Sequence, residues 1–216
     1  MEDLFRGKLV RLAADDPETS AKAFSRWGRN AEYKRLLDSE PPQFWSEKTI
    51  REWIEKDLEK KVPDSYYFKI HTLDGDHLIG FVGLRGIRWN QRDAWLGIGI
   101  GEPEYWGNGY GTDAMCLVLR YAFMELSLER VSLSVFASNQ RAIRSYEKAG
   151  LKREGIERQA VHRDGKTEDV LYMGILRQEC LAAQEYLAAQ EYLAAQEYLA
   201  AQQDMDYNGI GENHAE

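Results

Sequence analysis

The chain has few cysteines and no long apolar run. Cys116 and Cys180 are the only cysteines among 216 residues, and neither has metal-binding partners at a suitable spacing. Two isolated thiols argue against a disulfide framework or a metal centre and are typical of a cytoplasmic protein. No apolar window reaches 18 residues, so we expect no membrane partner. The N-terminal MEDLFRGKLV lacks the apolar core of a secretory signal, which also favours the cytoplasm.

The sequence also lacks a basic region that would bind nucleic acid. The net charge is −8, but residues 179–216 contain eight acids and no Lys or Arg. Residues 1–178 therefore hold 28 acids and 28 bases and are neutral. The acidity belongs to the tail, and we expect no nucleic-acid partner. A hydrophobic content of 44% and an aromatic content of 12% suffice for a folded core.

Hydrophobic periodicity predicts one mixed-sheet α/β domain over residues 1–178. Two helices are expected before the second strand, the first capped by Asp16 and the second opened by Ser46. Two more should occupy residues 112–127 and the stretch from Asn139 to Ala149. The turn at Asp74-Gly75-Asp76 predicts an antiparallel hairpin. The expected strands lie near residues 8–13, 66–73, 78–89, 94–101, 130–136, 152–161 and 168–176.

The C-terminal tail has a different character. LAAQEY occurs three times in tandem, so residues 179–203 are predicted to form a helical extension, and residues 204–216 to be disordered. A six-residue period advances about 600° along a helix, so the leucines form no continuous stripe and a heptad coiled coil is not supported. A duplicated, weakly docked segment and an oligomerisation helix both remain open.

The stretch EPEYWGNGYGTDAM places three glycines on alternate positions before an expected helix. A glycine turn at a helix N-terminus points backbone N–H groups outward and forms an anion site. The Lys-Ser/Thr pair of a nucleoside-triphosphate loop is absent, because Thr112-Asp113 follows Gly111. The spacing also fails the dinucleotide fingerprint. A simple tight turn remains the alternative.

Three motifs together resemble the GNAT superfamily of acetyl-CoA-dependent N-acetyltransferases. They are AWLGIGIG, WGNGYGTDA and NQRAIRSYEKAGL, in that order, and the resemblance covers about residues 6–177. It is closest to the branch that contains ribosomal-protein alanine N-acetyltransferases and spermidine acetyltransferases. The resemblance implies a GNAT-like fold, acetyl-CoA as co-substrate and no metal.

The resemblance also implies where acetyl-CoA binds. The pantetheine arm would lie in a V-shaped gap between the fourth and fifth strands and pair with the backbone of Ile98 and Ile100. Asn139 would bond the pantetheine or thioester region, and Tyr146 would protonate the departing thiolate. A plain helix cap and a half-buried aromatic remain the respective alternatives. The diphosphate would lie on a loop made of Trp106, Gly107, Asn108, Gly109, Tyr110, Gly111 and Thr112.

The sequence departs from the family pattern at three positions, and at the first of them Trp106 stands where Gln or Arg is often found. Asn108 stands where a cation is frequent, and Trp95 where relatives often carry Glu. Glu102 is then the candidate general base, with a surface carboxylate as the alternative reading. Neither cysteine suits a covalent acetyl-enzyme, so we expect direct attack in a ternary complex.

The acceptor and the assembly are less closely defined by the sequence. Between the first two expected helices lie Tyr33, Phe44 and Trp45 together with three carboxylates, which suits a cationic primary amine. That amine is either a small polyamine-like molecule or a protein N-terminus, and core packing is the other explanation for the aromatics. A non-catalytic acyl-CoA sensor is the alternative function, and a homodimer is possible.

Overall fold

The computed structural model describes residues 3–59 and 64–182. The chain divides into two units, Met1–Arg177 and Gln178–Glu216. Almost all of the second unit, including most of the predicted LAAQEY helix and the whole of residues 204–216, lies outside the described residues. The first unit carries the fold and the candidate site.

One mixed seven-stranded sheet forms the centre of the first unit, in the order β1-β2-β3-β4-β5-β7-β6. Every neighbouring pair is antiparallel except β4 and β5. The predicted hairpin at Asp74–Asp76 is confirmed, and a second hairpin closes where Arg163 pairs with Lys166. The strands are β1 Val10–Ala13, β2 Ser65–Thr72, β3 Leu78–Arg88, β4 Asp93–Ile100, β5 Arg130–Phe136, β6 Lys152–Arg163 and β7 Lys166–Leu176.

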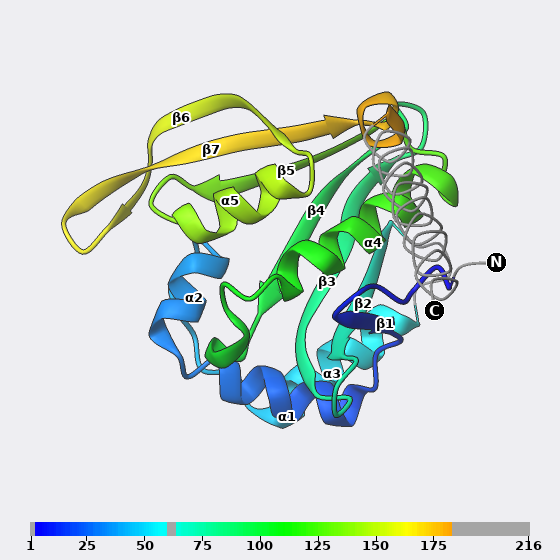
Figure 1. The fold of residues 1–216 in the computed structure, drawn as a ribbon. Helices are drawn as coiled ribbons and strands as arrows, with labels where there is room; N and C mark the ends of the chain where they lie inside the picture. The colour runs from blue at the N-terminus through cyan, green and yellow to red at the C-terminus, as the bar shows by residue number, and fades with distance from the viewer. Residues whose placement is uncertain (1–2, 60–63, 183–216) are drawn as a thin grey trace, which may run out of the picture. The chain divides into compact units, whose positions relative to one another are not determined.

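The parallel pair in the middle of the sheet is incomplete. β4 and β5 pair only over Asp93–Trp95 and Arg130–Ser132. Each strand is paired much further along its other edge, β4 with β3 and β5 with β7. The two strands therefore diverge beyond Trp95, as Figure 1 shows. This divergence is the V-shaped gap that the family resemblance implies.

Among the described residues up to Leu176, six helices flank the sheet, and the sequence predicted four of them. Side-chain caps begin α1, α3 and α5 at Asp16, Ser46 and Asn139, as expected. The expectation of only two helices before the second strand was wrong. Gly28 ends α1, and the Asn30 side chain caps a separate helix of only seven residues, too short to show a hydrophobic period. The helices are α1 Pro17–Trp27, α2 Ala31–Leu37, α3 Glu47–Leu58, the 3₁₀ helix η1 Pro103–Tyr105, α4 Tyr110–Met124 and α5 Gln140–Lys148.

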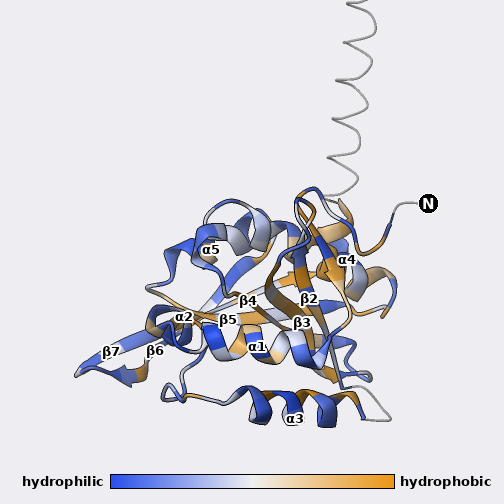
Figure 2. Cartoon of the chain, turned by 90° about the horizontal axis from the view of Figure 1, so that it is seen from below, coloured by the Kyte–Doolittle hydropathy of each residue, from blue (hydrophilic) through white to orange (hydrophobic). Residues whose placement is uncertain are grey.

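Helices cover both faces of the sheet. In Figure 2, α1 and α3 lie on one side of the strands, and α4 and α5 lie on the other. The apolar side of α4 is fully buried against the sheet, which is why its sequence is apolar over most of its length. At the start of α4, the Asp113 carboxylate accepts hydrogen bonds from the backbone N–H groups of Lys8, Leu9 and Val10. This contact holds β1 beside the glycine loop.

Trp27 fixes the end of β4 that leads into the glycine loop. Its ring is 2% exposed and packs with Phe24 and Tyr33. A Cβ on Gly101 would overlap this ring, so glycine is required there by close approach. Four residues earlier on β4, a Cβ on Gly97 would meet no atom within 4 Å.

This contrast predicts unequal effects for the same substitution at Gly97 of β4 and at Gly101, which directly follows β4. Gly101→Ala should lower the free energy of unfolding by about 1–3 kcal/mol, because the methyl group overpacks the buried indole. Gly97→Ala should change it by no more than about 0.5 kcal/mol. Urea denaturation of both variants checks this, and equal effects would contradict the close packing of Trp27 on Gly101.

Candidate functional site

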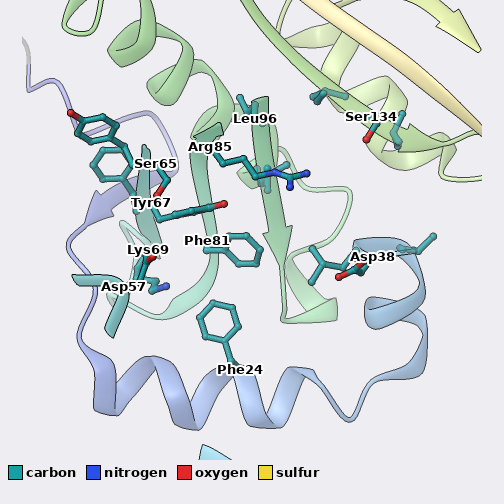
Figure 3. Close-up of a pocket in the computed structure, with 18 of the residues that line it drawn as sticks. Phe24, Asp38, Asp57, Ser65, Tyr67, Lys69, Phe81, Arg85, Leu96 and Ser134 are labelled. Atoms are coloured by element: carbon teal, nitrogen blue, oxygen red, sulfur yellow. The ribbon is translucent and has the colours of Figure 1, made fainter. Parts of the chain in front are cut away.

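A large cavity opens where β4 and β5 diverge. Its volume is about 1030 Å³, and it extends from the gap across the sheet face beneath α1 and α3. Leu96, Gly97 and Ile98 of β4 line it on one side of the gap, and Leu133–Phe136 of β5 line it on the other. Nine of the remaining lining residues are aromatic, and Figure 3 labels three of them, Phe24, Tyr67 and Phe81. Such a volume is at the upper end of the range for small-molecule sites.

The cavity floor is open at Gly97, where a Cβ would meet no atom within 4 Å. Gly83 of β3 lies opposite Gly97 of β4, and the Tyr67 side chain lies against Gly83. Residues two apart on a strand share a face, so Phe81 and Arg85 rise on either side of Gly83. The open space above Gly97 is therefore walled by side chains and lies directly beside the gap.

The backbone of β4 presents an unpaired edge to the gap. The Gly101 N–H bonds the Ile79 carbonyl of β3, and peptide groups alternate in direction along a strand. Hence the peptide groups of Leu96, Ile98 and Ile100 point away from β3 and toward the gap. The Ile100 carbonyl already accepts a hydrogen bond of 2.7 Å from the Trp106 indole N–H. The predicted pair Ile98 and Ile100 thus face the gap, with one carbonyl already bonded.

The glycine loop at the end of this edge requires glycine at two positions. Gly107 and Gly109 have φ values of +80° and +91°, in the left-handed region that a side chain disfavours. Gly109 is the N-cap of α4, and the first N–H groups of the helix, from Tyr110 to Thr112, have no partner within it. The third glycine differs, because a Cβ on Gly111 would make only ordinary contacts with Ile98 and Ile100. The helix start therefore presents free backbone N–H groups of the kind that suit an anion.

The side chains of Trp106, Asn108 and Thr112 in this loop contact other residues of the chain. The Asn108 amide donates to the Glu104 carbonyl, and the Thr112 hydroxyl bonds the Ser145 hydroxyl at 2.8 Å. The Trp106 ring carries the Arg141 guanidinium 4.0 Å from its centroid. Arg141 therefore supplies a cation beside the loop that sequence reasoning missed, because it lies 30 residues after Gly111 and only the fold brings it there.

Asn139 at the start of α5 and Tyr146 within it lie in different surroundings. The Asn139 side-chain oxygen accepts a hydrogen bond from the Ala142 N–H and so caps the helix. Tyr146 lines the cavity. Removal of its ring from water raises the pKa of Tyr146 to about 12, which keeps the phenol protonated at neutral pH.

The structure does not bring Glu102 to the cavity. Its carboxylate pairs with Arg26 and accepts a hydrogen bond of 2.8 Å from the Trp27 indole N–H. Glu102 follows Gly97 by five residues, a distance of about 16 Å along an extended chain. Its assignment as general base stays a prediction.

Part of the segment between the first two predicted helices lines the cavity, namely Leu36–Ser39, but its aromatic residues do not. Tyr33 is buried in a cluster with Trp27, and burial raises the pKa of its phenol. Phe44 and Trp45 are exposed, and neither lines the cavity. Asp38 does line it. Sequence reasoning missed the wall residues on β2 and β3, although Tyr67-x-Lys69 and Phe81-x-x-x-Arg85 place aromatic and charged groups on one strand face.

Residues 3–59 and 64–182, which the structure describes, contain neither a metal site nor a membrane-spanning helix. No group of three or more His, Cys, Asp or Glu is arranged to hold a metal ion. No helix there has the length and apolarity needed to cross a membrane.

Comparisons with known proteins agree with this geometry. The family described as acetyltransferase (GNAT) domain matches residues 8–152. "Probable N-acetyltransferase YjcK" of Bacillus subtilis is 38% identical over 133 residues, which is 61% of this chain and 71% of that protein. "Spermidine N(1)-acetyltransferase" of Vibrio cholerae is 33% identical over 105 residues, 49% of this chain and 60% of its own length. The structure of the Vibrio cholerae spermidine N-acetyltransferase in complex with CoA and spermine has a TM-score of 0.71 at 26% identity, covering 80% of this chain and 98% of that one.

The raised pKa of Tyr146 predicts a loss of stability in alkali. A phenol whose pKa rises from about 10 unfolded to about 12 folded stabilises the protein fully below pH 10. That contribution disappears as the pH rises through about 12. The free energy of unfolding of the wild type should therefore fall more steeply between these pH values than that of Tyr146→Phe, which has no phenol to ionise. Urea denaturation across the interval measures both slopes, and equal slopes would contradict the burial of this hydroxyl.

Proposed function

Because this chain belongs to the GNAT acetyltransferase family, an acetyl-CoA-dependent group of enzymes, we propose that it transfers the acetyl group of acetyl-CoA to a primary amine by direct attack. The observation that carries the proposal is the divergence of β4 from β5, which ends at a glycine loop and opens into a cavity. One continuous path thus joins an anion site, an unpaired strand edge and a space for the acceptor.

We assign acetyl-CoA to this path as follows. The diphosphate lies on the loop from Trp106 to Thr112, bound by backbone N–H groups. Arg141 adds positive charge that Asn108 does not supply. The pantetheine arm adds to the open edge of β4 at Ile98 and at the Ile100 N–H, since the Ile100 carbonyl is bonded to Trp106. Asn139 stays a candidate for a pantetheine contact through its free amide N–H₂.

The chemical step needs an oxyanion contact, a proton donor and an unprotonated amine. Peptide N–H groups of β4 that face the gap stabilise the negative charge on the carbonyl oxygen. The nitrogen–carbon bond forms as the carbon–sulfur bond breaks, and the Tyr146 phenol gives its proton to the departing thiolate. The proton that the nitrogen loses passes through water and restores the phenol. Protonated Tyr146 suits that role at neutral pH.

Glu102 has two possible roles that experiment distinguishes. As a general base it would take the amine proton through water. Its contacts with Arg26 and Trp27 favour a positioning role, in which it holds α1 against the end of β4. If Glu102 is the general base, the pH profile of kcat in Glu102→Gln should lose the step that comes from ionisation of this carboxylate. The second predicts lower stability with an unchanged pH profile.

The acceptor remains the least defined part of the proposal. The Vibrio cholerae neighbour binds CoA and spermine, and a small-molecule amine is the acceptor that this likeness suggests. A protein N-terminus is the second candidate. A cytoplasmic location and a homodimer stay predictions.

Calorimetric titration with acetyl-CoA and a thiol-release assay over an amine panel test the proposal together. Gly109→Glu should weaken acetyl-CoA binding by about tenfold or more, because a side chain with a like charge enters the left-handed loop position. Tyr146→Phe should bind acetyl-CoA normally and lose about a hundredfold or more in kcat. Gly155→Glu, at an open position on β6, is the matched control and should bind normally. A wild type that binds no acetyl-CoA would overturn the proposal.

A further inference from the structure

The short helix α2 connects the two halves of the sheet, β1–β4 and β5–β7. On the β4 side, the Tyr33 hydroxyl and the Leu37 side chain lie over Gly99, where an added Cβ would come within 2.9 and 3.1 Å of them. On the other side, Arg35 pairs with Asp164 in the turn between β6 and β7, with one hydrogen bond of 3.1 Å. Because β4 and β5 have stopped pairing before Gly99, α2 links the two halves at a level where the sheet itself does not.

Arg163 holds the C-terminal end of α2 from the β5 side. Its guanidinium donates two hydrogen bonds of 2.8 Å, one to the Arg35 carbonyl and one to the Asp38 carbonyl. The last carbonyl groups of a helix have no partner within it, so these bonds satisfy groups that the helix itself leaves open. The same guanidinium lies 5.6 Å from the centre of the Phe136 ring at the end of β5. One planar side chain therefore fixes both the distance and the direction of the helix end.

The segment that these two bonds hold lines the cavity. Residues 36–39, which we call the α2 wall, all line it, and Ala160 and Val161 of β6 line it next to them in the same list of neighbours of the gap. In Figure 3, Asp38 lies on the same side of the cavity as Ser134 of β5. The α2 wall therefore borders the space that we propose for the acceptor.

Arg163 contributes more to this arrangement than the ion pair beside it. The side chains of Arg35 and Asp164 are 46% and 59% exposed, and a pair so open to water contributes little to stability. A hydrogen bond from a charged guanidinium is stronger than one between neutral groups, and Arg163 makes two. Without them, the packing of α2 on β4 remains, but the α2 wall loses its main link to the β5 side. The wall is then free to move away from the acceptor space.

We propose that Arg163 is a positioning residue that holds the α2 wall against the acceptor and thereby selects amines by size. A wall fixed from both sides of the gap contacts a small amine and obstructs a bulky one. A wall held by β4 alone does neither. The inference rests on the proposed acetyl transfer and adds to it the group that limits the size of the acceptor.

Matched acceptors measure this selection. Propylamine and its diphenyl derivative, with both phenyl groups on the carbon farthest from the nitrogen, share a reactive group and differ in bulk. The tripeptides AGG and AWG differ likewise beside an N-terminal amine. Values of kcat and KM are measured for both pairs with the wild type, Arg163→Gln, Arg163→Lys and Asp164→Asn. Arg158→Gln, at an exposed position of β6 outside the cavity, is the control.

The wild type should prefer the small member of at least one pair by about tenfold in kcat/KM. Arg163→Gln should raise KM for that small acceptor by about tenfold and abolish most of the preference, while kcat and acetyl-CoA binding stay unchanged. Arg163→Lys should lie between, because it keeps the charge and loses the planar fork. Asp164→Asn should change KM by less than about threefold, and Arg158→Gln should leave it unchanged.

An unchanged KM and size preference in Arg163→Gln, or a wild type indifferent to bulk, would overturn the inference while leaving acetyl transfer to amines intact. An equal loss of kcat for small and bulky acceptors would also overturn it, because a disturbed fold would then be the cause, and urea denaturation of each variant would show that disturbance. Binding of acetyl-CoA without transfer to any amine would remove the proposed function and the inference with it.

Discussion

The site depends on the incomplete pairing of β4 with β5. Three residues of each strand hold the two halves of the sheet together, and beyond them each strand is paired only on its other side. A free strand edge in a sheet interior leaves N–H and C=O groups without partners, which is unfavourable unless a ligand or solvent satisfies them. Here the edge borders the cavity at Leu96–Ile98, which is why we propose that the amide groups of the pantetheine arm bond it.

The other features of the site follow from this divergence. Near the end of β4, the Trp106 indole N–H bonds the Ile100 carbonyl, and the ring carries the Arg141 guanidinium. At the narrow end, Trp95 contacts Tyr172 edge to face across the two sheet halves. Between them, Gly97 leaves the floor open. Thus β4 supplies both the open edge on which we propose that acetyl-CoA binds and, at Gly97, the open space that we propose for the amine.

Local sequence signals identified the parts of the site that are contiguous in the chain. The glycine loop, the strand before it and the helix cap at Asn139 each have a local physical cause, so they were predicted to within a few residues. Contacts between residues distant in the sequence were not predicted. Arg141 on Trp106, the Trp27 contact with Glu102, and Arg85 beside Gly97 all depend on how elements pack. The short α2 helix was missed because seven residues have almost no period, and the exposure of Phe44 shows that aromatic content alone does not locate a pocket.

Amide hydrogen exchange with and without acetyl-CoA tests the central claim most directly. If the coenzyme adds to the open edge of β4, exchange at Ile98 and Ile100 and in the loop from Gly107 to Thr112 should slow on binding. The interior of β2, which is paired on both sides, should be unchanged. Binding that leaves the β4 amides as exposed as before would contradict the account and place acetyl-CoA elsewhere on the fold.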